Sequence, residues 1–126
     1  MPMVVYVAAG GAIGAVARYG VMALVSSIWG QGFPLGTLVV NILGSFILGV
    51  LIETSALAWS PGPEIRAMLV IGVLGAFTTF SAFSLDAVTL LSRGETGAGF
   101  LYVAISVVLS IGGLWAGMAV SRYFFQ

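Results

Sequence analysis

The chain has 126 residues, of which 60% are hydrophobic, only 6% are charged and 18 are glycine. This composition lies outside the usual range of water-soluble domains and within that of helical membrane proteins. Four arginines balance four acidic residues, so the formal net charge is zero and no basic patch is available to bind nucleic acid. Because the sequence has neither cysteine nor histidine, disulfides, thiol chemistry and the common transition-metal sites are excluded.

Four apolar runs dominate the chain, at residues 4–28, 35–59, 65–91 and 99–124. A helix needs about 20 mostly apolar residues to cross a bilayer, so each run predicts a transmembrane helix. The separators are short and rich in Gly, Pro and charged residues, which predicts turns and antiparallel neighbours. The first run has no basic segment before it, which favours a membrane helix over a secretory signal. We therefore predict an all-α membrane protein in which residues 1–126 form a single transmembrane domain.

The first helix carries Gly10 and Gly14, and the fourth carries Gly113 and Gly117, each pair one helical turn apart. Small residues at this spacing let helix backbones approach closely in lipid, either between two subunits or within one. Four helices packed around a filled core leave no aqueous lumen, so a transport function implies association. A closed two-fold dimer is the commonest form of association.

The arginines give little preference for one orientation. Arg66 and Arg122 are expected on the side of the N-terminus, whereas Arg93 and the deeper Arg18 are expected towards the other side. Orientation normally follows the side richer in Lys and Arg. This small bias predicts insertion in both orientations, which would permit an antiparallel homodimer built from one sequence.

Polar side chains recur every fourth residue on two helices, namely Thr37, Asn41 and Ser45 on the second and Tyr102, Ser106 and Ser110 on the fourth. This spacing places each set on one helix face. Hydroxyl and amide hydrogens can replace the water shell of a small anion, so the two stripes are candidates to line a narrow path. Hydrogen bonding between helices is the alternative for each residue taken singly.

The third run is the least regular, because residues 72–84 bring glycines, threonines, serines and three aromatic residues into mid-membrane. We predict that this helix is broken near its middle, which is allowed at membrane depth where the freed backbone is buried or lines a polar cavity. Freed carbonyl oxygens suit a hard cation. Phe80 and Phe83 share a face, and their positively polarised ring edges could contact an anion.

No catalytic constellation is present, so we predict that the chain is not an enzyme. Glu53 and Asp86 lie near helix ends, and Glu64 and Glu95 lie in loops. Such positions are typical of solvated or interfacial charges. Asp86, two residues after Ser84, is the acid most able to take part in function.

Three motifs occur in order on the first three helices: GxxGxxxRY at residues 11–19, GTLxVNxxGxF at 36–46 and GxxTTFSxFS at 75–84. Together they resemble the Fluc family of fluoride channels, also called CrcB. The resemblance covers essentially the whole chain. It implies an antiparallel, dual-topology homodimer with two fluoride pores, which passively exports fluoride and lowers its cytoplasmic concentration in a prokaryotic inner membrane. It also implies a sodium ion with a structural role at the dimer centre.

The resemblance assigns roles residue by residue. Gly75 and Thr78 are expected to bind sodium through their backbone carbonyls, and Arg18 is expected to make a structural pairing near the dimer seam. The expected fluoride pore consists of Thr37, Asn41, Thr79, Phe80, Ser81, Phe83, Tyr102, Ser106 and Ser110.

The chain departs from the family pattern at Ala76 and Ala82, neither of which is an expected ligand, and at Asp86, where the family often has glutamate. The shorter Asp86 side chain is therefore not assigned to the pore. The alternative function is a small four-helix multidrug exporter, which depends on an acidic residue deep in its first helix. The first helix of this chain has Arg18 and no acid.

Overall fold

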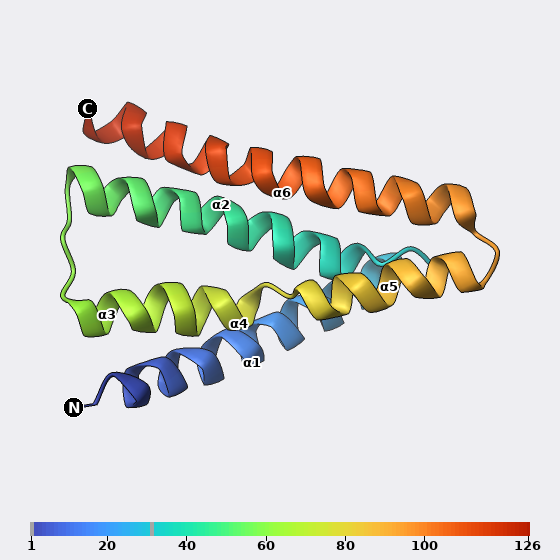
Figure 1. Cartoon of the computed structure of the whole chain (residues 1–126), viewed down its shortest axis with the longest axis horizontal. Coiled ribbons are helices and arrows are strands. Elements are labelled where there is room, and N and C mark those ends of the chain that lie inside the picture. Colours follow the sequence, from blue (N-terminus) through green and yellow to red (C-terminus); the bar gives the residue numbers. More distant parts are fainter. Residues whose placement is uncertain (1, 31) are drawn as a thin grey trace.

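The computed structural model describes residues 2–30 and 32–126 (Figure 1). Within these residues there are four long apolar helical segments and no strands, which confirms the predicted all-helical class. The first, second and fourth segments are α1 (Met3–Trp29), α2 (Leu35–Leu57) and α6 (Thr96–Phe125). The third is divided into α3 (Pro63–Ala67), η1 (Met68–Leu74), α4 (Gly75–Phe77) and α5 (Phe80–Ser92). Each of the four is long and apolar enough to cross a membrane.

The helix ends differ from the apolar ranges by up to three residues. The fourth helix begins at Thr96 rather than at residue 99, because backbone hydrogen bonding continues beyond the apolar stretch. The third segment begins at Pro63, whose missing N–H costs nothing at the first helical position. The second helix ends at Leu57, two residues early. The turn expected between the first two helices contains Gln31, which lies outside the described residues.

The third segment is broken at Thr78 and Thr79, within residues 72–84, where the sequence predicts a break. Both residues are extended, with φ/ψ of −85°/158° and −152°/113° respectively. The Thr79 hydroxyl accepts a hydrogen bond from the Ala82 N–H at 3.1 Å and so caps α5. Just before the break, η1 is wound as a wider π-helix, a form that is often found at functional sites.

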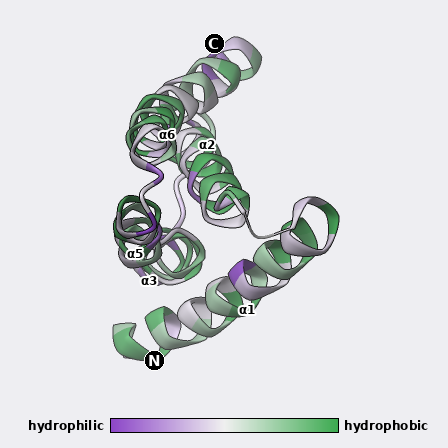
Figure 2. Ribbon diagram, turned by 90° about the vertical axis from the view of Figure 1, so that its right-hand side faces the viewer, coloured by the Kyte–Doolittle hydropathy of each residue, from purple (hydrophilic) through white to green (hydrophobic). Residues whose placement is uncertain are grey.

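The two termini and the turn between α2 and α3 lie at one end of the molecule, and the turn between α5 and α6 lies at the opposite end with the C-terminus of α1 and the N-terminus of α2 (Figure 1). The long helices therefore alternate in direction. The most extensive helix pairing is between α2 and α6, followed by that between α1 and η1. Hydrophobic colours occur along every helix in Figure 2, and many large apolar side chains are exposed, among them Val16 and Ile111. Such a surface is suited to lipid or to a partner in the membrane.

The paired glycines pack within the subunit. A Cβ atom on Gly10 or Gly14 would collide with the carbonyl oxygen of Met68 or Val73, so both glycines lie directly against η1. A Cβ atom on Gly117 would collide with the carbonyl oxygen of Phe46 on α2 in the same way. These contacts decide between the two interpretations of the spacing for these three glycines, because they join helices of one chain.

The environment of Glu53 differs in part from the one predicted. It is buried rather than solvated, and its carboxylate accepts a hydrogen bond from Arg122 Nη2 at 2.7 Å. Thr54 and Ser121, the neighbours of this pair in the sequence, join their hydroxyls at 2.7 Å. Of the two environments predicted for this acid, solvated and interfacial, the first does not hold, because α6 runs alongside the last turn of α2 and places Arg122 against the carboxylate.

Candidate functional site

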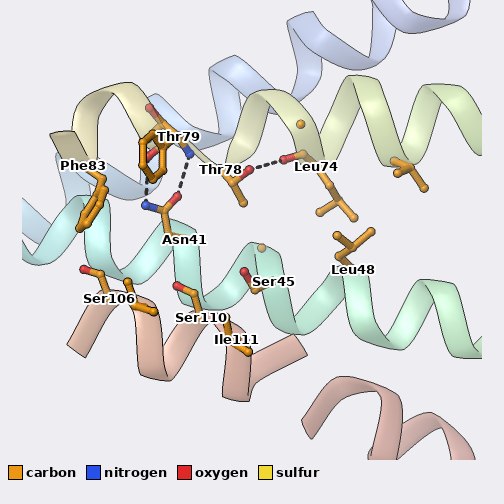
Figure 3. Close-up of a pocket in the computed structure, with 15 residues that line it drawn as sticks. Asn41, Ser45, Leu48, Leu74, Thr78, Thr79, Phe83, Ser106, Ser110 and Ile111 are labelled. Atoms are coloured by element: carbon orange, nitrogen blue, oxygen red, sulfur yellow. Dashed lines mark hydrogen bonds between the residues drawn. The ribbon is translucent and has the colours of Figure 1, made fainter. Parts of the chain in front are cut away.

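A cavity of about 360 Å³ lies between α2, α6 and the broken third segment (Figure 3). Eight of the residues assigned from the sequence line it: Asn41, Gly75, Thr78, Thr79, Phe80, Phe83, Ser106 and Ser110. Ser45, from the polar stripe on α2, lines it as well. The fold therefore brings both polar stripes and the helix break to one place.

Asn41 is hydrogen-bonded to the backbone of the break through both the oxygen and the nitrogen of its carboxamide. Its Oδ1 accepts a hydrogen bond from the Thr79 N–H at 2.7 Å, and its Nδ2 donates to the Thr79 carbonyl oxygen at 3.1 Å (Figure 3). The peptide group of Thr79, removed from helical pairing, thus regains both partners that a buried backbone requires. One N–H of the Asn41 amide is not used by these two bonds.

The break also diverts the usual helical donors of two carbonyl groups. In an α-helix the carbonyl of residue i accepts from the N–H of residue i+4, so Thr79 would serve Gly75 and Ala82 would serve Thr78. Instead the Thr79 N–H donates to Asn41, and the Ala82 N–H donates to the Thr79 hydroxyl. Gly75 and Thr78 both line the cavity. Their carbonyl oxygens are of the ligand type that a hard cation prefers.

The hydroxyl of Ser106 is buried without a protein partner. Ser106 is 6% exposed, and its Oγ is the one buried side-chain polar atom that makes no hydrogen bond within residues 2–30 and 32–126. Buried polar groups are nearly always paired, so an unpaired one beside a cavity points to a ligand or to water. Ser106 and Ser110 face the cavity from successive turns of α6 (Figure 3).

Aromatic rings continue from the break towards α6. The ring centroids of Phe80 and Phe83 are 5.3 Å apart, and those of Phe83 and Tyr102 are 5.4 Å apart. Phe80 is 78% exposed although it lines the cavity, so few other residues of the chain cover its ring. Tilted rings of this kind can present their positively polarised edges to an anion.

Thr37 and Tyr102 do not line this cavity but meet at Asp86. Oδ2 of Asp86 accepts hydrogen bonds from the Thr37 hydroxyl at 2.6 Å and from the Tyr102 hydroxyl at 3.2 Å. Each of the three residues lies about one helical turn from a cavity residue on its own helix, namely Asn41, Ser106 or Phe83. Thr37 and Asp86 line a second cavity of about 220 Å³. Asp86, which was not assigned to the pore from the sequence, thus stands between the two cavities.

The last two assigned residues lie near the break. Arg18 donates from Nε to the Ala76 carbonyl oxygen at 2.9 Å, which links α1 to α4. Ser81 is exposed on the first turn of α5 and lines neither cavity. Its hydroxyl lies 3.3 Å from that of Thr79.

Gly44 and five apolar residues complete the cavity wall, and no pattern in the sequence identified these five as lining residues. They are Leu48, Val70, Leu74, Val107 and Ile111. In a chain this apolar, nothing distinguishes a lining leucine from a lipid-facing one. Across the described residues no three His, Cys, Asp or Glu side chains gather as a metal site.

Comparison with known proteins gives a consistent result. Residues 5–118 match the family model described as CrcB-like protein, Camphor Resistance (CrcB). The chain is 52% identical over 122 residues to a protein of Rhodospirillum centenum, a match that covers 97% of both chains. It is 50% identical over 119 residues to a protein of Agrobacterium fabrum, covering 94% of this chain and 95% of the relative. Both relatives are named fluoride-specific ion channel FluC.

Proposed function

The chain belongs to the CrcB family, and from this premise we propose that it is a channel that conducts fluoride across a bacterial membrane. The observation that carries the proposal is the cavity in which donors from α2 and α6 face the broken third segment. The relatives are named as ion channels, which confirms the expectation that the chain is not an enzyme. The missing first-helix acid counts against the multidrug exporter.

The cavity offers the kind of groups that a fluoride ion needs. Fluoride is small and strongly hydrated, so a pore must replace its water with several donors and still let it leave. Ser106 has a free hydroxyl, Asn41 has a free amide N–H, and Ser45 and Ser110 add further hydroxyls. None of these groups is charged, which avoids binding the anion too tightly. The edges of Phe80 and Phe83 supply weak additional attraction.

A sodium ion held by the Gly75 and Thr78 carbonyls belongs to the same proposal. Both carbonyls have lost their helical donors to side chains, as described above. A cation near the cavity would lower the cost of placing fluoride in a medium of low dielectric constant. In this proposal the ion is structural and is not transported.

The working unit in this proposal is an antiparallel homodimer in the cell inner membrane, which exports fluoride passively down its gradient. The high exposure of Phe80 leaves the cavity wall open on one side, where a second copy would complete it. Arg66 lies in the last turn of α3, Arg122 lies in the last turn of α6 and Arg93 caps the C-terminus of α5. The α3 helix and the C-terminus of the chain lie at one end of the fold, and the turn between α5 and α6 lies at the other (Figure 1). This near balance supports insertion in both orientations.

Fluoride efflux from liposomes tests the channel directly. Purified protein is reconstituted with internal sodium fluoride, and efflux is followed with a fluoride electrode. Sodium chloride and an ethidium-like cation serve as comparison solutes. Rapid fluoride loss without loss of the other two is expected. Cation export without fluoride efflux would replace the proposal with the exporter.

Two further measurements test the site and the topology. Asn41→Asp adds a negative charge to the cavity, so it should abolish fluoride efflux while the dimer stays intact on size-exclusion chromatography. Reporter domains fused to the C-terminus should be active on both sides of the membrane. Activity on one side alone would reject dual topology.

A further inference from the structure

We propose that Asn41 is a positioning residue for the cation site, because it keeps the third helix broken and so makes the Gly75 carbonyl available to sodium. The inference rests on the proposed function in one respect, since it takes the sodium ion from there. It goes further in assigning one side chain to both ions. The pair of hydrogen bonds between Asn41 and Thr79 carries it.

The first step concerns the Thr79 N–H. If the helix were continuous, this group would donate to the Gly75 carbonyl oxygen. Instead, the Thr79 N–H donates a hydrogen bond to Asn41 Oδ1 at 2.7 Å, while Asn41 Nδ2 donates to the Thr79 carbonyl oxygen at 3.1 Å. The amide orientation is fixed by its partners, because only an oxygen can accept from the Thr79 N–H. Asn41 thus replaces the helical partner of Thr79 and leaves Gly75 without a donor.

The second step concerns the neighbouring carbonyl. The Thr79 hydroxyl accepts from the Ala82 N–H at 3.1 Å and thereby withholds that donor from the Thr78 carbonyl. This cap requires the extended conformation of Thr79, with φ −152° and ψ 113°. The two Asn41 bonds hold the Thr79 peptide in place across the gap between α2 and the break. Both proposed sodium ligands therefore depend on the attachment of one peptide group to α2.

The third step is the coupling between the two ions. The Asn41 carboxamide has three hydrogen-bonding groups, namely the acceptor Oδ1 and two N–H donors. Oδ1 and one N–H are bound to Thr79, which leaves one N–H for the cavity. The side chain that would touch fluoride is therefore the same one that shapes the sodium site. Its replacement should change sodium binding as well as fluoride flux.

The experiment compares the sodium-dependent thermal stability of the purified, detergent-solubilised protein. The unfolding temperature is measured in sodium chloride and in the chloride of a large organic cation, for the natural chain and for Asn41→Leu and Asn41→Asp. Leu has the same branched shape but cannot accept from Thr79, whereas Asp keeps the acceptor. The natural chain and Asn41→Asp should be stabilised by sodium, and Asn41→Leu should lose this shift. A full sodium shift in Asn41→Leu would overturn the proposal.

A second pair of variants and a control keep the test decisive if Asn41→Leu does not fold. Thr79→Val removes the hydroxyl that caps α5, so this variant should lose the sodium-dependent shift in unfolding temperature. Thr79→Ser keeps the hydroxyl and should keep the shift. Ser45→Ala, a change within the same cavity wall, should keep the shift. Hydrogen exchange of the natural chain adds a measurement without mutation, because Asn41 should protect the Thr79 amide even without sodium. Rapid exchange at Thr79 or an unaltered shift in Thr79→Val would contradict the mechanism.

The results separate this inference from the proposed function. If the natural chain conducts fluoride but Asn41→Leu keeps its sodium shift, the inference fails and the channel stands. If the natural chain does not conduct fluoride but loses its sodium shift with Asn41→Leu, the channel proposal fails and the positioning role stands. A natural chain that sodium does not stabilise would remove the cation site and this inference together.

Discussion

The hydroxyl of Thr37 on α2 donates to Oδ2 of Asp86 on α5 at 2.6 Å, and the same oxygen accepts from Tyr102 on α6 at 3.2 Å. One carboxylate oxygen therefore joins three helices between the two cavities. Tyr102 is 0% exposed, so no solvent is available to replace Asp86 as its partner. The cluster links three helices, so its loss should lower the free energy of unfolding of the whole bundle.

Removal of Asp86 should destabilise the fold more than removal of the groups that bond to it. Asp86→Ala leaves the buried Tyr102 hydroxyl without a partner, which should cost about 1–3 kcal/mol. Tyr102→Phe in the Asp86→Ala background should restore part of that loss. The measurement is a double-mutant cycle of unfolding free energies in detergent. Strict additivity of the two changes would show that the bond contributes nothing.

Ser106→Ala should separate stability from conduction. The Ser106 hydroxyl is buried without a protein partner, so its removal should leave the unfolding temperature unchanged or slightly higher. If the hydroxyl serves fluoride, efflux from liposomes should fall several-fold. Ser55→Ala is the matched control, because that hydroxyl donates to the Leu51 carbonyl within α2 and lies outside the cavity. Undiminished efflux in Ser106→Ala would remove this hydroxyl from the fluoride path.

Gly14→Ala should disrupt the contact between α1 and η1. Its added Cβ atom would collide with the Val73 carbonyl oxygen, and backbone atoms cannot move aside as a flexible side chain can. Overpacking of this kind typically costs about 1–3 kcal/mol. Gly11→Ala is the control, because its Cβ atom would meet no atom within 4 Å. Thermal unfolding of the two variants should show a large loss for Gly14→Ala and none for Gly11→Ala.

The pair of Glu53 and Arg122 should respond asymmetrically to substitution. The Glu53 side chain is 11% exposed and that of Arg122 is 53% exposed. Arg122→Gln leaves a buried carboxylate without its cation, whereas Glu53→Gln leaves an arginine that still reaches water. We expect Arg122→Gln to lower the unfolding free energy by about 1–2 kcal/mol more than Glu53→Gln. Chemical unfolding of both variants measures the difference, and equal losses would contradict the assigned burial.

The sequence by itself determined the membrane helices, the presence of a break near the middle of the third one and the faces that carry donors. These features are local, because hydropathy sets the span of a helix and a spacing of four sets its face. The Gly, Thr and Ser cluster at residues 72–84 also predicted a break near the middle of the third helix, and the structure places that break at Thr78 and Thr79. Periodicity identifies which side chains share a face, but not what lies opposite them.

Only the tertiary structure decided how those faces are used. Helix rotation and crossing placed Asn41 on the Thr79 peptide, paired Glu53 with Arg122, and packed Gly14 inside the subunit. The same geometry divided the two polar stripes, because Asp86 engages Thr37 and Tyr102 while Ser106 remains free. The hydrogen bonds among these outcomes depend on atoms distant in the chain meeting within about 3 Å, which no local pattern encodes.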